Sequence, residues 1–170
     1  MTNQNINLSN GTLVYQDYKK LIEKKIIDSK NKIIDDSIQP ASLDLRLGIY
    51  AYEISSSFLA IKNTVENRLK FFKKKKINLL NGYVFKKNIT YLVELQERLS
   101  LTSNLSGKCN PKSSTGRLDI FCRVITDYNS EYEIINSGYK GKLYLEITTK
   151  TFDILFSTGN KLNQLRVKNG

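Results

Sequence analysis

The stretch Ser42-Leu43-Asp44-Leu45-Arg46-Leu47 alternates strictly between polar and apolar residues. Successive side chains of a β-strand point to opposite faces, so this alternation predicts a strand with one polar and one apolar face. The stretch Leu143-Tyr144-Leu145-Glu146-Ile147 has a large aliphatic residue at every second position and predicts the same arrangement. Two such strands, far apart in the chain, indicate a mainly β protein.

Other short segments rich in β-branched and aromatic residues lie between and after these two strands, separated by Gly, Asn and Ser. Many short strands at this spacing predict a β-barrel or a β-sandwich. Residues 30–34 resemble one further short strand. The other expected strands are 50–54, 82–85, 90–95, 120–125, 154–156 and 162–167.

The N-terminal region predicts a single helix over residues 15–27. Leu21, Ile22 and Ile26 recur at helical spacing, and Asp17 lies near the expected start. No repeat or low-complexity linker divides the chain. We therefore expect one domain over residues 1–170, with a helical segment at about 12–28 and the β-barrel at about 30–167.

The chain is strongly basic, with 27 Lys and Arg against 16 Asp and Glu and a formal net charge of +11. Such a balance favours polyanionic partners such as nucleotides, nucleic acid or anionic membranes. A compositional bias towards Lys, Asn and Ile is the alternative explanation. For the densest run, Lys73-Lys74-Lys75-Lys76, we favour a solvated tract in a loop or edge strand over a binding patch, and nucleic acid is not an expected partner.

Several classes of protein are excluded by composition. The 170 residues contain no His and only two Cys, so a Ser-His-Asp triad, a Cys-His dyad and the usual zinc sites cannot be built, and no metal site is expected. The apolar runs are only a few residues long, so no membrane span is expected. Residues 1–5 lack the basic region that precedes the apolar part of a secretory signal, which favours a cytoplasmic protein.

Residues 110–118 read Asn-Pro-Lys-Ser-Ser-Thr-Gly-Arg-Leu and predict a one-turn helix. Asn110 is a suitable N-cap, Pro111 suits the first helical position, and Gly116 is expected to end the helix. Free backbone N–H groups at such a turn, beside basic and hydroxyl side chains, can bind a phosphate chain. Ser113 and Arg117 are four residues apart and share a face. A simple capped turn, whose hydroxyls satisfy local backbone groups, is the alternative.

The last informative segment runs from residue 136 to 147. Gly138 and Gly141 predict a tight turn into a strand on which Glu146 points away from the apolar face, together with Tyr144. A lone Glu on a strand is normally exposed. If a neighbouring subunit covered it, it would become a usable general base. Similarly, without further context residues 42–47 fit a half-buried strand that carries a surface pair of Asp44 and Arg46.

Taken together, these segments resemble the dCTP deaminase family, whose members have the dUTPase-like fold. Residues 112–118 are similar to the family's basic-Ser-Ser-x-x-Arg-Leu motif, residues 138–146 to its Gly-aromatic-x-Gly-x-x-x-Leu-Glu motif, and residues 39–48 to its first conserved strand. Leu162-Asn163-Gln164-Leu165 resembles the closing strand. The motifs occur in the family's order over residues 35–167, and they are most similar to the N-terminal half of the two-domain deaminases of alphaproteobacteria.

This resemblance implies a distorted β-barrel or jelly roll with a short N-terminal helix, and a role for each matching residue. Glu146 matches the general base that activates water for attack on C4 of cytosine. Ser113 and Arg117 match the residues that hold this water and polarise the pyrimidine. Asn136 stands where single-domain members often carry Asp, and Asp127, which an insertion separates from it, is the residue that would compensate. The implied nucleotide-binding residues are Lys112, Ser113, Ser114, Arg117, Asn136, Tyr144 and Gln164.

The resemblance also implies partners and cofactors. The substrate would be dCTP, with dUTP as product, and Mg²⁺ would enter only as a partner of the triphosphate, without a catalytic metal. Each active site would lie at an interface, in a trimer-like homo-oligomer or against a second homologous half of a longer protein. The expected reaction is hydrolytic deamination of dCTP. A dUTP diphosphatase, which usually uses Asp where this chain has Glu146, and a non-catalytic nucleotide-binding module are the alternatives.

Overall fold

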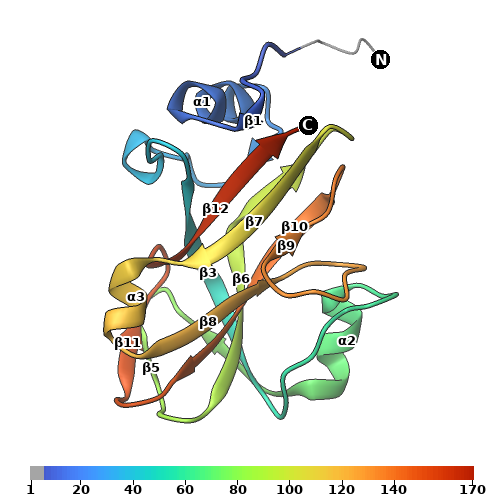
Figure 1. The fold of residues 1–170 in the computed structure, drawn as a ribbon. Helices are drawn as coiled ribbons and strands as arrows, with labels where there is room; N and C mark the ends of the chain where they lie inside the picture. The colour runs from blue at the N-terminus through green and yellow to red at the C-terminus, as the bar shows by residue number, and fades with distance from the viewer. Residues whose placement is uncertain (1–5) are drawn as a thin grey trace.

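The computed structural model describes residues 6–170, so the interpretation of residues 1–5 lies outside the described part of the chain. Strands dominate, as expected, and Figure 1 shows them wrapped around one another beneath a single N-terminal helix. The helices are α1 (Tyr15–Glu23), α2 (Val65–Phe72) and α3 (Ser113–Arg117), with a 3-10 turn at Asp35–Ser37. The strands are β1 (Gly11–Thr12), β2 (Ile27–Asp28), β3 (Leu43–Ile54), β4 (Lys73–Asn78), β5 (Tyr83–Phe85), β6 (Thr90–Ser100), β7 (Leu105–Pro111), β8 (Ile120–Ile125), β9 (Ile134–Ile135), β10 (Lys140–Thr149), β11 (Ile154–Phe156) and β12 (Lys161–Asn169).

Most strands belong to one strongly bent antiparallel sheet. Its order is β8-β10-β6-β3-β12-β7-β9, and β1, β2 and β4 add short pairings at its margins. Helix α3 connects β7 directly to β8, so the two ends of the sheet approach each other and the sheet nearly closes (Figure 1). Strands β5 and β11 form a separate small pair. This architecture confirms the predicted mainly β barrel with a short N-terminal helix.

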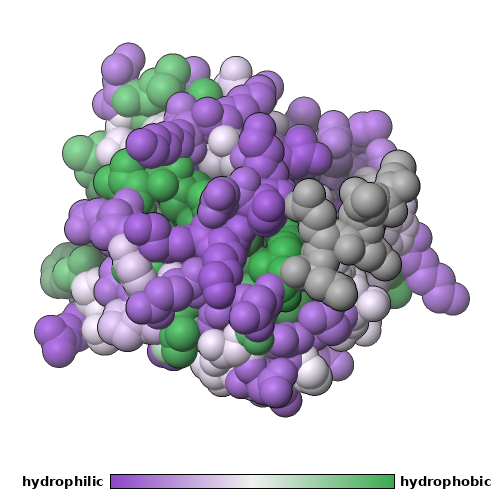
Figure 2. All heavy atoms as spheres, turned by 90° about the horizontal axis from the view of Figure 1, so that it is seen from above, coloured by the Kyte–Doolittle hydropathy of each residue, from purple (hydrophilic) through white to green (hydrophobic). Residues whose placement is uncertain are grey.

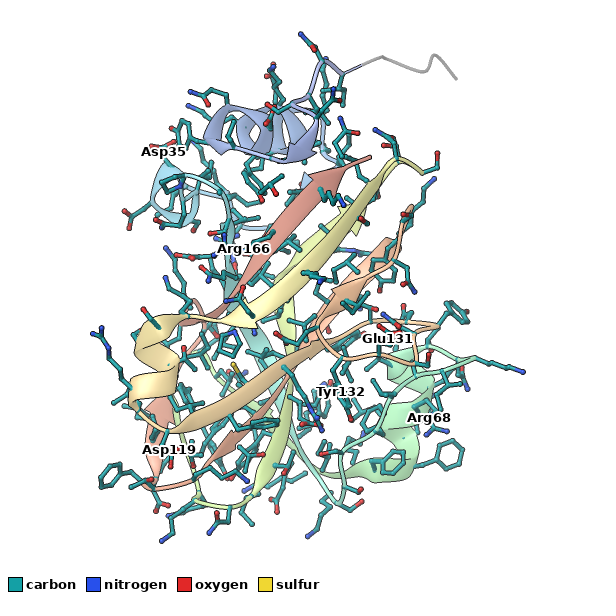
Figure 3. All side chains as sticks on the ribbon, in the orientation of Figure 1. Asp35, Arg68, Asp119, Glu131, Tyr132 and Arg166 are labelled. Atoms are coloured by element: carbon teal, nitrogen blue, oxygen red, sulfur yellow. The ribbon has the colours of Figure 1, made fainter. Side chains whose placement is uncertain are left out.

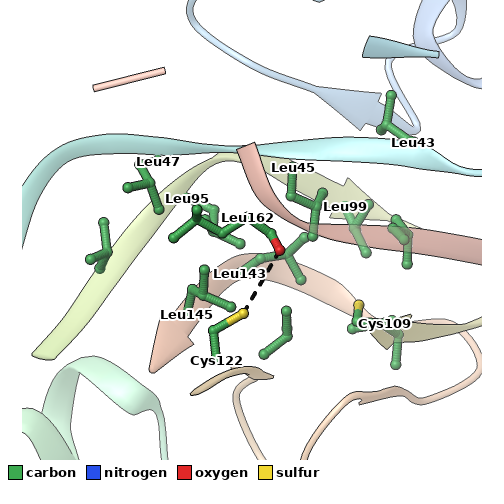
Figure 4. Packing of buried hydrophobic residues seen from close by; sticks show 14 of the residues in the cluster. Leu43, Leu45, Leu47, Leu95, Leu99, Cys109, Cys122, Leu143, Leu145 and Leu162 are labelled. Carbon is green, nitrogen blue, oxygen red and sulfur yellow. Dashed lines mark hydrogen bonds between the residues drawn. The ribbon is translucent and has the colours of Figure 1, made fainter. Parts of the chain in front are cut away.

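The main core fills the inside of this barrel. Leu43, Leu45 and Leu47 of β3 lie at most 1% exposed, and Leu143 and Leu145 of β10 are fully buried. Figure 4 shows Leu45 and Leu47 on the side of β3 that faces Leu143 and Leu145. The prediction from the alternating sequence is therefore confirmed for the apolar positions, because the apolar face of each strand lines the core. Two free cysteines, Cys109 and Cys122, are buried in the same cluster, and the Cys122 thiol donates to the Leu162 carbonyl over 3.8 Å.

A second apolar cluster lies on the outer face of the same sheet. Helix α2 and the loop before it bring Phe58, Val65 and Leu69 against Leu92 of β6 and Tyr144 of β10. Thr64 caps α2, because its hydroxyl accepts from the Asn67 N–H over 3.1 Å. The outer face of the central strands is therefore covered by other parts of the same chain. The polar residues of the alternating pattern had indicated a face exposed to solvent.

The expected helix over residues 15–27 is too long at its C-terminal end. The helix ends at Glu23, where Lys25 adopts a left-handed conformation with a φ of 57°. The Ile26 N–H donates to the Leu21 carbonyl and the Lys25 N–H to the Ile22 carbonyl, which is the bonding of a Schellman motif. Glycine normally occupies this position, and its absence hid the helix end.

The strand expected over residues 30–34 is not formed, and the prediction is wrong. The Asn31 and Lys32 carbonyls accept hydrogen bonds from the Arg46 guanidinium at 3.1 Å each. A side chain therefore takes the acceptors that a neighbouring strand would use. By contrast, the lysine run forms the edge strand β4 with all four lysine side chains exposed.

The surface is mostly hydrophilic at the end of the molecule that carries α1 and the C-terminus, as Figure 2 shows. Over residues 6–170 the helices are too short and too polar to span a membrane.

Candidate functional site

The predicted helical turn after residue 110 exists, with shifted ends. Lys112 is the N-cap of α3 and Pro111 is the last residue of β7, so the expectation that Asn110 caps the turn is wrong. The pairing of β7 with β12 continues to Pro111 and keeps both preceding residues extended. Thr115 anchors the turn, because its buried hydroxyl donates to the Leu162 carbonyl over 2.7 Å.

Gly116 does not end this helix. The helix runs on to Arg117, and Asp119 takes the left-handed conformation, with a φ of 55°. Ser113, Ser114 and Arg117 are all exposed. The turn therefore presents two hydroxyls and a guanidinium to solvent.

A cleft of about 560 Å³ opens beside this turn, and we call it the α3 cleft. Lys112, Ser113 and Gln164, three of the predicted nucleotide-binding residues, line it together with Ser42. Arg166 of β12, labelled in Figure 3, is a further lining residue. The structure thus brings together parts of three sequence segments that lie far apart in the chain.

An ion pair crosses the α3 cleft. Lys112 Nζ lies 2.6 Å from Asp44 Oδ2, which also accepts from the Gln39 side-chain amide at 3.3 Å. Asp44 is 1% exposed, and its Oδ1 accepts no hydrogen bond from residues 6–170. The alternative of a surface pair between Asp44 and Arg46 is wrong, because both residues are buried and Arg46 pairs with Glu97 instead.

Glu146 lies elsewhere, in the middle of β10 and on the outer face of the sheet. It is 2% exposed, and Arg123 of β8 and Leu92 of β6 stand opposite it in the neighbouring strands. Arg123 Nε donates to Glu146 Oε2 over 2.8 Å. The expectation of an exposed Glu, buried only by a neighbouring subunit, is wrong, because side chains of this chain cover it.

Arg123 is the functional candidate that the sequence analysis missed. Its guanidinium carbon lies 3.4 Å from the centroid of the Tyr132 ring and 5.1 Å from that of Phe121. Tyr132 belongs to the loop between β8 and β9 and lies beside the middle of β8 (Figure 3). Burial, with a smaller contribution from the Glu146 carboxylate, raises the pKa of the Tyr132 hydroxyl. The expected strand over 120–125 contained Arg123, but only the pairing of β8 with β10 places it opposite Glu146.

The remaining predicted residues, Tyr144, Asn136 and Asp127, lie outside the α3 cleft and differ in their exposure. Tyr144 is 4% exposed and packs in the second apolar cluster, and burial raises the pKa of its hydroxyl. Asn136 is exposed in the turn before β10. Asp127 has a structural contact, since its Oδ1 accepts from the Val65 N–H at the start of α2 over 2.8 Å.

The predicted site residues therefore fall into two groups within one chain. Lys112, Ser113 and Gln164 line the α3 cleft, whereas Glu146 and Tyr144 belong to the outer face of β10 and do not line it. Among residues 6–170, no three His, Cys, Asp or Glu side chains lie close enough together to hold a metal ion.

Comparison with known proteins shows the family of the chain. Residues 9–170 match the family model described as the 2'-deoxycytidine 5'-triphosphate deaminase N-terminal domain. The crystal structure of 2'-deoxycytidine 5'-triphosphate deaminase from Agrobacterium tumefaciens superposes with a TM-score of 0.92 at 41% sequence identity. The match covers 94% of this chain and 48% of that one, so the chain spans about half the length of that relative. The chain therefore belongs to the family of dCTP deaminase N-terminal domains.

Proposed function

We propose that this chain carries the catalytic machinery of a dCTP deaminase, which converts dCTP and water into dUTP and ammonia. The observation that carries the proposal is the buried carboxylate of Glu146, which Arg123 holds and which matches the Glu of the motif that the sequence shares with the family. A carboxylate within reach of a bound water is the group that a metal-free hydrolytic deamination needs.

Glu146 would act as general base and then as general acid. It takes a proton from the water that attacks C4 of cytosine, and this proton is delivered to N3. The resulting tetrahedral adduct carries a hydroxyl and an amino group on C4. The hydroxyl proton then passes through Glu146 to the amino nitrogen, the C4–N4 bond breaks, ammonia leaves and C4 becomes a carbonyl.

The triphosphate would lie against the α3 turn. Lys112, Ser113 and Ser114 offer a positive charge and two hydroxyls there, and Gln164 lines the same cleft. A lysine keeps the charge of the family's usual arginine but lacks its bidentate fork. Mg²⁺ enters the proposal as part of the substrate, bound to the triphosphate oxygens.

The complete site would be assembled from two surfaces. Glu146, with Tyr144 and Asn136 on the same strand and turn, forms one surface, and Ser113 and Arg117 on α3 form the other. Since a single chain keeps these two groups apart, we propose that α3 of a second copy, or of a second homologous half, completes each site in a trimer-like assembly. A cytoplasmic location is part of the proposal, because the substrate is a free nucleotide.

Incubation of the intact protein with dCTP and with dUTP, followed by separation of the products, tests this function. The proposal predicts ammonia and dUTP from dCTP. Release of pyrophosphate and dUMP from dUTP, without ammonia, would identify a diphosphatase instead. Binding of dCTP without any product would contradict an enzymatic role.

A further inference from the structure

We propose that Arg123 and Tyr132 are positioning residues that hold the Glu146 carboxylate in one orientation, with its Oε1 atom presented for proton transfer. This inference rests on the proposed function and goes beyond it, because neither residue belongs to the motifs that identify the family. Three observations on the surroundings of Glu146 carry it.

The first observation is that the two oxygens of Glu146 differ. Oε2 accepts the hydrogen bond from Arg123 Nε at 2.8 Å, and within residues 6–170 Oε1 accepts none. Oε1 is nevertheless not fully enclosed by the protein, so solvent reaches it. One oxygen is thus fixed and the other is open, in a residue that is otherwise 2% exposed.

The second observation concerns what fixes the guanidinium. Tyr132 lies against its flat face, at 3.4 Å from the guanidinium carbon to the ring centroid. Stacking of this kind uses the face of the group and leaves its in-plane N–H donors free for hydrogen bonds. The direction of Nε towards Oε2 is therefore set by the ring, and Tyr132 acts on Glu146 through Arg123.

The third observation is that, among residues 6–170, no other charged group pairs with this carboxylate. On the opposite side, β6 places the fully buried Leu92 beside Glu146. Arg123 is the only cationic side chain that pairs with Glu146 among the described residues. Its side chain is 27% exposed, so the pair lies at the surface rather than in the closed interior. Glu146 can therefore contact a substrate through Oε1 while the hydrogen bond from Arg123 to Oε2 stays intact.

Misplacement of a reacting group by about 1 Å can cost about 10²-fold in rate, which sets the expected size of the effect. In the intact protein, Arg123→Met is expected to lower kcat for dCTP by about this factor, with KM within a few-fold of wild type. Arg123→Lys keeps the charge but not the stacked plane, and is expected to recover only part of the loss. Tyr132→Leu is expected to lower kcat, by less than Arg123→Met does. Tyr132→Phe keeps the aromatic ring and is expected to have a kcat close to that of wild type.

A double-mutant cycle separates positioning from a merely structural role. In the Glu146→Gln background, Arg123→Met is expected to cause no further loss, because it acts only through that carboxylate. Arg68→Met is the matched control, since Arg68 also lies over an aromatic ring, Phe72 at 5.6 Å, but has no carboxylate partner among the described residues. Its kcat should stay at the wild-type value.

The outcomes are distinct. Wild-type protein without ammonia release would overturn the proposed function, and the assigned roles with it. An active wild type, combined with an unchanged kcat in Arg123→Met or with equal losses in both backgrounds, would overturn this inference alone. If Arg123→Met does not fold, as judged by its melting curve, Tyr132→Leu against Tyr132→Phe decides: equal kcat values in these two variants would contradict the inference.

Discussion

Two Arg–Glu pairs of this protein have the same length and very different surroundings. Arg46 Nε lies 2.8 Å from Glu97 Oε1, and Arg123 Nε lies 2.8 Å from Glu146 Oε2. In the first pair both carboxylate oxygens also accept from the Arg46 backbone N–H, at 3.0 and 3.3 Å. The remaining guanidinium nitrogens of Arg46 donate to Ser29 and to the backbone carbonyls of residues 31 and 32. Within the described residues, the side chains of the second pair make one hydrogen bond, from Arg123 Nε to Glu146 Oε2.

The difference separates a structural pair from a reactive one. A buried charge that is fully hydrogen-bonded fixes its surroundings and has nothing left to offer a ligand. Arg46 uses its bonds to hold residues 29–32 against β3, and Glu97 is completely buried. Glu146 instead has one oxygen, Oε1, that accepts no hydrogen bond within residues 6–170 and is not fully enclosed. Open hydrogen-bonding capacity, rather than the presence of an ion pair, therefore marks the candidate catalytic group.

Replacing the Glu by Gln should lower the rate in one pair and the stability in the other. The effect on the rate, at Glu146, is expected to be the larger of the two. Glu146→Gln keeps the size of the side chain but removes the base, and should lower kcat for dCTP by about 10²- to 10⁴-fold. Binding of dCTP, measured by calorimetry, and the melting temperature should stay close to wild type. A variant that retains activity within a few-fold of wild type would show that another group is the base.

Glu97→Gln should affect stability instead. It leaves the Arg46 charge buried without a counter-charge, and breaking such a pair costs about 3–5 kcal/mol. For a domain of this size each kcal/mol lowers the melting temperature by about 2–4 °C. Thermal melting of the variant measures this loss, and kcat measured well below the melting temperature should be unchanged. If Glu97→Gln had a normal melting temperature and a reduced kcat, the assignment of the Arg46–Glu97 pair as structural would be wrong.

Lys112 provides an intermediate case, because its pair with Asp44 lies inside the α3 cleft and the Lys112 side chain is 27% exposed. If Lys112 holds the triphosphate, Lys112→Gln should raise KM for dCTP by about 10-fold or more, in line with about 1.5–3 kcal/mol for a hydrogen bond to a charged group. Lys112→Arg should stay near wild type. Steady-state kinetics at fixed Mg²⁺ measures both, and a KM unchanged in Lys112→Gln would place the triphosphate elsewhere.

Glu133 allows a smaller test, on pH dependence. Burial raises the pKa of its carboxyl, despite the hydrogen bonds that it accepts from the Val124 N–H and the Asn163 amide. A raised pKa in the folded state means that the folded protein binds this proton more tightly than the unfolded chain, so the stabilisation is present at acidic pH and is lost as the pH rises through that pKa. Glu133→Gln should therefore melt slightly above wild type at pH 7.5.

The advantage of this variant should shrink as the pH is lowered towards the ordinary range of a carboxyl group, because wild-type Glu133 then becomes neutral as well. Melting curves of both proteins over this pH range, at constant ionic strength, measure the difference. An advantage of Glu133→Gln that grows at acidic pH would contradict the assigned direction.

Features set by local sequence were predictable, and features set by long-range pairing were not. The strands at 120–125 and 154–156 were predicted with their observed bounds, because their residues carry the β signal themselves. Helix α2 was missed although Val65, Leu69 and Phe72 stand at helical spacing, because it is only eight residues long and runs directly into the lysine run of β4. The strand expected over 30–34 fails because Arg46 takes its carbonyls.

The site shows the same division. The motifs around Lys112 and Glu146 were visible in the sequence, and the structure places Lys112, Ser113 and Gln164 in one cleft. The burial of Glu146 and the role of Arg123 depend on the register between β8 and β10, which no local pattern reveals. Tyr132 lies in the loop after β8, whose path is set by the fold.

The most direct test of the account is a crystal structure of the intact Glu146→Gln protein with dCTP. The account predicts that the cytosine lies beside residue 146 and Arg123. A water should lie about 3–3.5 Å from C4, in hydrogen-bond contact with the amide that replaces the carboxylate. The triphosphate should lie against Lys112 and Ser113 of a second copy or half. A nucleotide whose base binds away from residue 146, with no water between the two, would contradict the assignment of Glu146 as the base.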